Sequence, residues 1–570
     1  MAANTKSHSP YYRKAVPPQE VSPPLQSAPP LKHETILLED GKTLFEKDIG
    51  IPMRDGILLY ADVYRPDPSI KAKTPTLVLF APFGKHGAVP RERFQNMGVD
   101  FEKLSKHTHW ELPDPLPWCG EWGYSFLLVD PRGTWWSEGD ASNHISPEEG
   151  RDGYDIVEWA SQQEWSTGDI GWGGGVSYYA MSAYQTAVLK PPHLKAIMIW
   201  EGISDIYREV NAPGGIPNIP FQHFWMNMTG NGLGMTEDHA VNSLEHPLFD
   251  EYWQSKVVDW SLIDVPVLAV TGWSSLGLHL RGTIEAWKQM SSTNKYLIIH
   301  GGREWSEFYK DENIKRQHLF WDRYLRDVSN EVDAWPRVEM AARTSATESS
   351  RRLDSDFPPK AHLTKYRFSA DGKLALNDGS TSSGPSQSVS FIAHKSDSVA
   401  IFDLKINRRI EITGYSSVKL FIQALGFPDV DLFVALQRID KDGQVIKFYN
   451  STQKLEADAT FGWLRASHRE LDTEKSIPER PVHLHQRRLW LRPQDVVEVN
   501  VELWPSSTVW EAGETLRLAV KGTAFTDPEN MTQFKGPSHS FGEVRIWMGG
   551  EYESELLVPV VTSLGELRDA

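Results

Sequence analysis

Long apolar segments alternate with helix-type segments between residues 36 and 334. The apolar segments have the pattern of buried strands and lie at residues 76–80, 124–129, 169–172, 194–200, 265–270 and 296–299. Residues 177–189 carry apolar side chains at helical spacing, and Pro191 and Pro192 end that segment. Buried strands that alternate with helices are typical of a parallel sheet covered on both faces. This part of the chain is therefore predicted to be an α/β fold.

The pattern changes at three places along the chain. Residues 206–262 are rich in Pro, Gly, Asn, His and Trp, and they predict a helical cap inserted into an α/β core of residues 36–205 and 263–334. Residues 335–570 contain short segments of alternating polar and apolar residues, strictly so at 497–503, and predict a C-terminal β-sandwich of the jelly-roll type. Residues 1–35 are Pro-rich with little apolar content, and they predict a disordered or wrapping tail.

The composition excludes several classes of function. The chain has 570 residues, which is too long for a single core. Its net charge of −17 argues against nucleic acid or an anionic membrane as partner. No apolar segment reaches the roughly 18–20 residues that span a bilayer, and the N-terminus has no signal-peptide core. We therefore expect a cytoplasmic enzyme with a small-molecule substrate. The sequence leaves open whether it forms a homo-oligomer.

The segment Gly171–Ala180 has the most specific chemical pattern in the chain. It predicts a strand that ends, turns sharply at Ser177 and continues as a helix, which is the shape of a nucleophile elbow. Gly175 fills the first small position of the G-x-S-x-G pattern, whereas Tyr179 occupies the last one. We predict Ser177 as the nucleophile. The backbone N–H of Tyr178, directly after it, is the expected first donor of an oxyanion hole.

Several further segments resemble one family of enzymes. They are Met53–Gly56, Tyr60–Pro66, Val129–Gly133, Gly150–Asp155, Leu464–Arg469 and Ala512–Leu518. With these segments, residues 48–565 resemble the cocaine-esterase and X-prolyl dipeptidyl-peptidase group of serine hydrolases (CocE/NonD). The resemblance implies an α/β-hydrolase core, a helical cap and a jelly-roll domain. It also implies hydrolysis of esters or amides through an acyl-enzyme.

The chain departs from this family at the expected second oxyanion donor. The family usually supplies a Tyr hydroxyl there, but Phe83 stands at that position and has no hydroxyl. Loss of one such donor typically costs about 10²–10³ in rate. Lys85 or His86 could substitute, although both residue types are mostly exposed. We assign Phe83 and Trp273 to substrate binding.

The catalytic acid and base also depart from the family pattern. The family places an Asp after the strand that matches residues 267–272, where this chain has Ser275, and a His after the next strand, where it has Glu307. His300 and His279 both follow a predicted strand and are the two candidate bases. The sequence leaves the choice open.

The acid is equally open. Glu201 closes a predicted strand and is the first candidate for the acid, and Glu304 is a further candidate. For Glu201, a structural salt bridge is at least as good an explanation.

No cofactor motif is convincing, and none is expected. The chain has no His-Glu-x-x-His sequence and no phosphate-binding loop. His483 and His485 would share one face of a strand, but no third metal ligand is evident, so we predict no metal. Two functions remain. One is a serine esterase or amidase acting on a small, largely apolar or aromatic metabolite. The other is a lyase, isomerase or cyclase that uses the same pocket without the triad.

Overall fold

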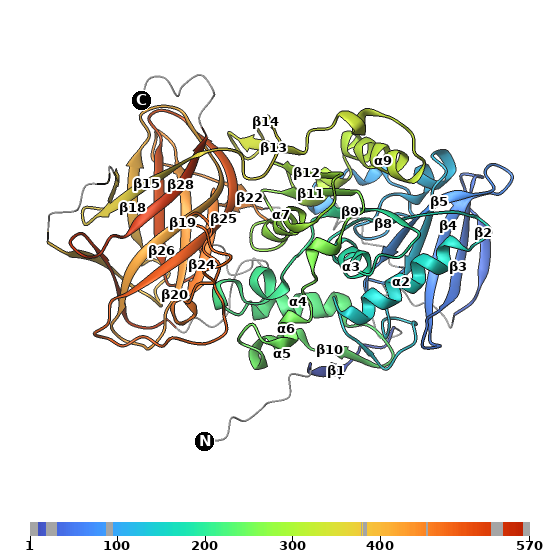
Figure 1. Cartoon of the computed structure of the whole chain (residues 1–570), viewed down its shortest axis with the longest axis horizontal. Coiled ribbons are helices and arrows are strands. Elements are labelled where there is room, and N and C mark those ends of the chain that lie inside the picture. Colours follow the sequence, from blue (N-terminus) through green and yellow to red (C-terminus); the bar gives the residue numbers. More distant parts are fainter. Residues whose placement is uncertain are drawn as a thin grey trace.

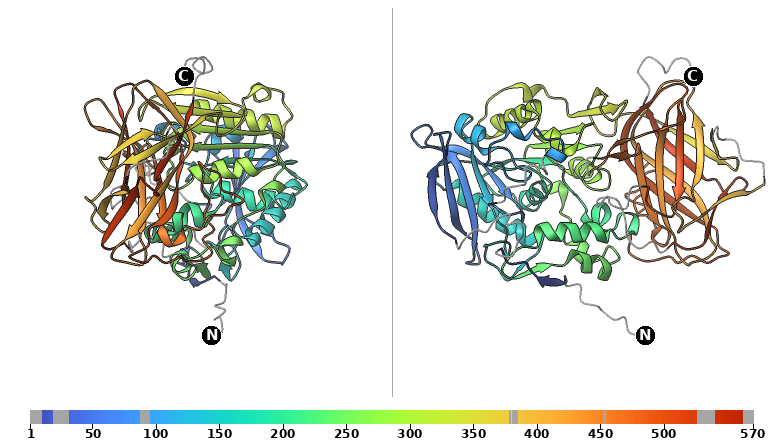
Figure 2. Two further views of the ribbon diagram at one scale, coloured as in Figure 1. Left: turned by 60° about the vertical axis from the view of Figure 1, so that its left-hand side comes forward. Right: turned by 180° about the vertical axis from the view of Figure 1, so that it is seen from behind.

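An α/β core and an all-β C-terminal domain lie side by side along the long axis of the molecule (Figures 1 and 2). The structure is a computed structural model that describes residues 10–18, 31–86, 95–377, 379, 385–451, 454–525 and 540–561. The core occupies the blue and green half in Figure 1, and the C-terminal strands occupy the orange and red half. Helices of residues 219–254 lie below the core in this view and form the cap.

The core is built on one mixed sheet with a parallel centre. Its strand order is β2-β3-β4-β6-β5-β8-β9-β11-β12-β13-β14, and the pairs from β6 to β13 are all parallel. The strands are β2 (Glu34–Leu37), β3 (Thr43–Pro52), β4 (Leu58–Pro66), β5 (Thr74–Phe80), β6 (Ser125–Val129), β8 (Ser166–Val176), β9 (Leu194–Trp200), β11 (Val267–Gly272), β12 (Lys295–His300), β13 (Val338–Arg343) and β14 (Ser349–Asp354). The predicted parallel sheet is therefore present, and antiparallel strands extend it at both edges.

Both faces of this sheet are covered, as the continuous apolar strands require. In β9, Ile197 and Ile199 belong to the core cluster on one face, whereas Met198 and Trp200 belong to the cluster on the other. The helices of the core are α2 (Pro147–Ser161), α3 (Tyr178–Ala187), α7 (Leu280–Gln289), α8 (Glu304–Phe308) and α9 (Asp311–Leu325). None of the helices in the described part of the chain has both the length and the apolar character needed to cross a bilayer.

The cap lies between β9 and β11, where the composition predicted an insertion. It comprises η4 (Tyr207–Asn211), η5 (Pro213–Gly215), α4 (Ile219–Thr229), β10 (Met235–Glu237), α5 (His239–Glu245), α6 (Glu251–Gln254) and η6 (Trp260–Leu262). The strand β10 pairs with β7 (Ala141–Ser142) of the core. This pairing connects the cap to the core beside the helix α4.

Of the two alternatives predicted for residues 1–35, a disordered or a wrapping tail, the described part of these residues has the wrapping one. The strand β1 (Tyr12–Lys14) pairs antiparallel with β10, and the N–H groups of Ala15 and Val16 donate to the carbonyls of Gly234 and Gly230. Residues 34–37 form β2 at the edge of the core sheet. The strands β1 and β2 pair through backbone hydrogen bonds and carry no apolar side-chain pattern, so composition alone could not reveal their pairing. Residues 1–9 and 19–30 lie outside the described residues.

The C-terminal domain consists mainly of antiparallel strands, as the alternation predicted. Val499, Val501 and Leu503 are buried, and the charged and polar residues between them are not. The principal strands are β15 (His362–Ser369), β16 (Lys373–Leu376), β17 (Gln387–Ile392), β18 (Ala400–Lys405), β19 (Ile410–Ala424), β20 (Asp431–Ile439), β24 (Thr460–Arg465), β25 (Val497–Trp510), β26 (Thr515–Lys521), β27 (Glu543–Met548) and β28 (Glu555–Val561). The long strand β19 pairs with β25, β27 and β28. The jelly-roll connectivity itself stays a prediction.

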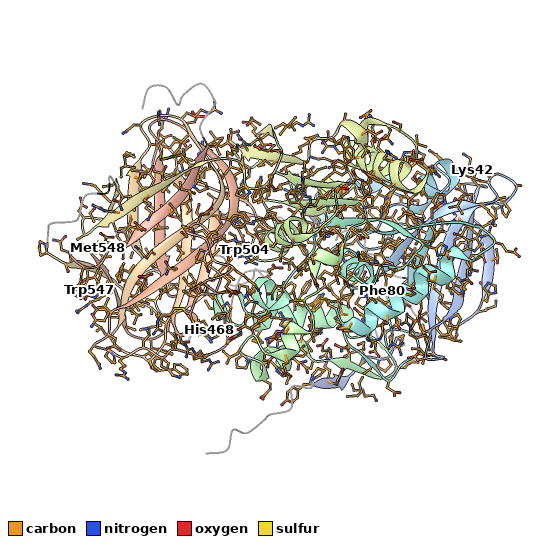
Figure 3. All side chains as sticks on the ribbon, viewed as in Figure 1. Lys42, Phe80, His468, Trp504, Trp547 and Met548 are labelled. Atoms are coloured by element: carbon orange, nitrogen blue, oxygen red, sulfur yellow. The ribbon has the colours of Figure 1, made fainter. Side chains whose placement is uncertain are left out.

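The first two strands after residue 335, the predicted start of the C-terminal domain, extend the core sheet. The strand β13 pairs with β12 in the core sheet and also forms a one-residue bridge to β25, so it connects the two domains. Arg281 of α7 contacts Glu502 of β25 at 3.0 Å, which adds an ion pair between them. His468 and Trp504 lie on the side of the C-terminal domain that faces the cap (Figure 3), and a Cβ on Gly215 of the cap would collide with the ring of His468.

Candidate active site

Ser177 occupies the sharp turn between β8 and α3. Its backbone has φ 64° and ψ −113°, a conformation that non-glycine residues rarely adopt, and its N–H donates to the carbonyl of Trp200. A Cβ on Gly175 would lie 2.8 Å from the ring of Tyr179, so only glycine fits there. Strain of this kind is stored at functional sites because the surrounding structure holds it in place. The predicted elbow is present, with Tyr179 tolerated at its last position.

His279 is the histidine that the fold brings to Ser177. It precedes α7 in the loop after β11, and its Nε2 lies 3.2 Å from Ser177 Oγ. Its other ring nitrogen, Nδ1, lies 2.9 Å from Oε1 of Glu304 at the start of α8. The hydroxyl, imidazole and carboxylate therefore form a continuous series, in which His279 and Glu304 are buried and Ser177 is half-buried.

Ser275 stands where the family has its Asp, and it supports the other two groups. Its hydroxyl donates to Glu304 Oε2 at 3.2 Å and lies 3.3 Å from His279 Nδ1, and it accepts the backbone N–H of His279 at 3.3 Å. These contacts fix the imidazole between Ser177 and Glu304. Glu304 was a further candidate from the sequence. The Glu304-Trp305 pair, directly after the predicted strand that ends at His300, was its only signal.

His300 and Glu201 do not contact Ser177, which argues against one of the two candidate bases and against the first candidate for the acid. His300 Nε2 instead lies 3.5 Å from Glu201 Oε1, and Glu201 Oε2 accepts a hydrogen bond from Thr271 Oγ1 at 2.7 Å. The two residues end the strands β12 and β9, which lie on either side of β11 in the sheet. The sequence correctly predicted that His300 lies near the site, at the end of β12. It could not show which way the imidazole ring faces.

Burial dominates the protonation of these groups. It lowers the pKa of His279 to about 4, so the imidazole is neutral and able to accept a proton at neutral pH. Burial also raises the pKa of Glu304, the nearby charge of Glu201 raises it further, and the charge of His300 lowers it. For His300, burial lowers the pKa, but the contact with Glu201 and the charges of Glu307 and Glu304 outweigh it and give a net rise.

A largely apolar cavity of about 310 Å³ opens onto Ser177 and His279. Phe83 lines it, as predicted, and packs edge-on against the rings of Tyr178 and Tyr179. Large apolar side chains from the cap and the core complete the wall: Met181, Phe221, Phe224, Trp225, Leu278 and Trp305. The cap residues fall at helical spacing on α4, a pattern present in the sequence but not interpreted as a pocket wall.

Three other predicted residues have structural roles. Trp273 is fully buried, does not line the cavity, and donates its indole N–H to the carbonyl of Ala341, so the assignment to substrate binding is wrong. The ammonium of Lys85 is buried against Asp48 and Asp62, and His86 lies 2.9 Å from Asp62. Neither side chain lines the cavity, so neither replaces the missing Tyr hydroxyl.

Three groups of His, Asp and Glu in the described part of the chain lie close enough to hold one ion: His144, Glu237 and His239; Asp48, Asp62 and His86; and Glu201, His279 and Glu304. In the first, Lys256 Nζ lies 2.9 Å from Glu237, and in the second, Lys85 contacts Asp48, so each group already contains a cation. In the third, both nitrogens of His279 face other protein groups. We therefore assign none of them as a metal site.

Comparison with known proteins identifies the family. The family model described as X-Pro dipeptidyl-peptidase (S15 family) matches residues 55–303, and that of the X-Pro dipeptidyl-peptidase C-terminal non-catalytic domain matches residues 330–557. A solved CocE/NonD family hydrolase from Staphylococcus aureus is 32% identical, with a TM-score of 0.86 over 93% of this chain and 96% of that one. The chain belongs to the CocE/NonD family. It is an acyl hydrolase of the esterase and peptidase class.

More distant relatives agree with this assignment. Cocaine esterase from a Rhodococcus species is 22% identical, over 92% of this chain and 99% of that protein. A solved α-amino acid ester hydrolase is 17% identical with a TM-score of 0.68, which shows a common fold and covers 95% of this chain and all of that one.

Proposed function

We propose that this CocE/NonD hydrolase cleaves an uncharged ester or amide with a large apolar or aromatic group, through an acyl-enzyme on Ser177. The contact of His279 Nε2 with Ser177 Oγ at 3.2 Å, with Glu304 behind His279 Nδ1, carries this proposal. Together the three residues supply the nucleophile, the general base and the group that orients the base.

The reaction then follows from this geometry. Ser177 Oγ attacks the substrate carbonyl while its proton passes to His279 Nε2, and Glu304 stabilises the imidazolium through Nδ1. His279 next donates that proton to the leaving oxygen or nitrogen, which leaves the acyl group on Ser177. A water molecule, deprotonated by the same nitrogen, attacks the acyl carbonyl and releases the acid product and free Ser177.

The acid and the base have exchanged places relative to the usual order. α/β-Hydrolases follow the chain order Ser, Asp or Glu, His. Here the order is Ser177, His279, Glu304, with the histidine after β11 and the carboxylate after β12. The exchange is feasible because β11 and β12 are paired neighbours, so their following loops meet at the same edge of the sheet.

Backbone groups complete the proposed oxyanion hole. Tyr178 is the first residue of α3, and its N–H is one of the helix-start donors that lack a partner within the helix. Its hydroxyl donates to the buried Glu149, which anchors this end of α3. For the second donor we assign the N–H of Phe83, which follows β5 as this fold usually requires and lines the cavity at Ser177.

The cavity supports an uncharged, apolar substrate. Its wall is mainly aromatic and aliphatic, and its volume of about 310 Å³ is at the lower end of the range for small-molecule pockets. The carboxylate of Glu111 also lines the cavity. It accepts the indole N–H of Trp305, which holds it against the cavity wall. The alternative of a lyase, isomerase or cyclase rested on the apparent absence of a catalytic triad. The arrangement of Ser177, His279 and Glu304 argues against that absence.

A panel of substrates tests this proposal. Purified enzyme is incubated with p-nitrophenyl esters of acetate, butyrate, octanoate and benzoate, and separately with a dipeptidyl X-Pro p-nitroanilide that carries a free N-terminal ammonium. We expect turnover of the neutral esters, with kcat/KM rising with acyl size until the cavity is filled. Turnover confined to the charged dipeptide, or equal rates for all esters, would contradict the proposed substrate class.

The acid limb of the pH profile follows from the burial of His279. His279 acts as a base only when it is neutral. We therefore expect kcat/KM to have its full value above the pKa of His279 and to fall as the pH drops through that pKa. Because burial lowers that pKa to about 4, we expect activity to persist below pH 6 and to fall with a midpoint near 4–5. An acid limb centred near 6.5, the ordinary pKa of His, would show that the imidazole is not desolvated as the structure indicates.

Replacement of Glu304 by glutamine should distinguish the two buried carboxylates. The amide keeps the size of the side chain but cannot stabilise the imidazolium, and we expect kcat to fall by about 10³–10⁴. The matched variant Glu201→Gln keeps an oxygen for Thr271 and should fall by no more than about threefold. Steady-state kinetics with one ester decide the point, and a larger loss for Glu201→Gln than for Glu304→Gln would assign the acid to Glu201.

A further inference from the structure

A second histidine and a second carboxylate lie behind the triad, and the proposed mechanism does not use them. Glu201 ends β9 with φ 59°, a strained conformation for glutamate, and His300 ends β12. Their side chains contact each other at 3.5 Å, and Glu201, His279 and Glu304 have ligand atoms within 4.8 Å of one another. Two carboxylates and two imidazoles therefore share one buried site.

The two histidines line different cavities. His279 lines the apolar cavity at Ser177, whereas His300 lines a separate polar cavity of about 670 Å³ between β12, β13 and the helices α8 and α9. Arg303, Lys310 and Arg316 are among the residues of the polar cavity. His300 thus borders a cavity other than the one that opens onto Ser177.

Two of these four groups, Glu304 and Glu201, would carry like charges in the same buried site. Glu304 must be ionised to stabilise the imidazolium of His279, but Glu201 is a second buried carboxylate beside it. Like charges at this distance disfavour each other strongly, and one of them takes up a proton unless a positive charge is near. His300 is the group placed to provide that charge, since it contacts Glu201 directly.

We propose that His300, as an imidazolium paired with Glu201, is a positioning residue that keeps Glu304 ionised and able to accept a hydrogen bond from the Nδ1–H of His279. The inference rests on the proposed function, since it concerns the acid of that triad. Burial and the charge of Glu201 raise the pKa of Glu304, whereas the hydrogen bond from Ser275 and the charge of His300 lower it, which is the direction that the proposal requires of His300. The net rise in the pKa of His300 agrees as well.

The other charged groups around His300 leave this assignment intact. Glu307 on α8 adds negative charge, but Lys310 contacts it at 2.6 Å. Across the polar cavity, Glu339 is paired with both Arg316 and Arg351. Arg303 lies over the ring of Tyr449 at 4.6 Å, not against His300. Among these groups, Glu201 is the one that contacts His300.

Three variants test the inference: His300→Gln, Glu201→Gln and the double variant. In His300→Gln the two carboxylates must share a proton, so less of Glu304 is ionised at pH 7 and we expect kcat/KM at that pH to fall roughly 10- to 100-fold. Activity should recover as the pH rises from 6 to 9. In the double variant the repulsion is gone, so kcat/KM at pH 7 should return to within about threefold of Glu201→Gln.

The readouts are the pH profile of kcat/KM with a neutral p-nitrophenyl ester and the rate of labelling by a fluorophosphonate, with folding checked by circular dichroism. Rescue of His300→Gln by Glu201→Gln is an outcome that a purely structural role for His300 would not give. An unchanged profile in His300→Gln, or a double variant no better than His300→Gln, overturns the inference. Normal labelling of the wild type at Ser177 in either case leaves the proposed function standing, and no labelling would remove both.

Discussion

Replacement of Ser177 by alanine is expected to lower kcat/KM for ester hydrolysis by about 10⁶-fold, the scale seen when a serine nucleophile is removed. The reason is specific to the elbow. Ser177 is held with φ 64° and its Oγ lies 3.2 Å from His279 Nε2, a contact that no other hydroxyl of the described residues makes. Steady-state kinetics with a neutral ester measure the loss.

The matched control is Ser161→Ala. Ser161 ends α2, its hydroxyl donates only to the carbonyl of Glu158, and it does not line the cavity. We expect this variant to keep wild-type kinetics. Residual activity of Ser177→Ala within about tenfold of the wild type would mean that hydrolysis does not pass through this serine.

Replacement of His279 by glutamine is the second large effect, and we expect a loss of about 10⁵–10⁶ in kcat. Glutamine fills the space and can still contact Ser275 and Glu304, but it cannot accept and return a proton. Both nitrogens of the imidazole contact functional groups, Nε2 the hydroxyl of Ser177 and Nδ1 the carboxylate of Glu304. A neighbouring side chain therefore cannot take over the role of His279 by rotating. The rate of single-turnover labelling by a fluorophosphonate and the steady-state kcat should fall together.

His300→Gln is the paired comparison for His279→Gln, because His300 was the other base compatible with the sequence. The two losses should differ by about 10³ or more at pH 7, and the difference should widen at higher pH. Equal losses would mean that proton transfer at Ser177 depends on both rings. A larger loss for His300→Gln would place the base on β12 and contradict the geometry around Ser177.

Much of the fold could be predicted because burial leaves a clear pattern in the sequence. The continuous apolar segments at 194–200 and 265–270 can only be satisfied between two helical layers, and β9 and β11 lie there. The cap was visible as a change in composition. The N-terminal strand β1 was not, because its pairing with β10 depends on backbone hydrogen bonds that leave no mark on side-chain type.

The site could be predicted only in part, for a geometric reason. The elbow is local, so its glycines and Ser177 are legible in ten consecutive residues. The base and acid come from loops about 100 and 127 positions further on, and their choice depends on which way each ring and carboxylate faces. His279 follows β11 and His300 ends the neighbouring strand β12, and Glu201 and Glu304 follow β9 and β12 on either side of β11, so sequence alone cannot separate them. The exchange of His and Glu between the loops after β11 and β12 became visible only in the structure.

The central claim is that Ser177 is a nucleophile activated by His279, and intact mass after treatment with a fluorophosphonate tests it most directly. We predict a single adduct on the wild type, none on Ser177→Ala, and labelling slowed by several orders of magnitude on His279→Gln, with Ser161→Ala labelled at the wild-type rate. No adduct on folded wild-type protein would contradict the account. So would an adduct that persists in Ser177→Ala, or full-rate labelling of His279→Gln.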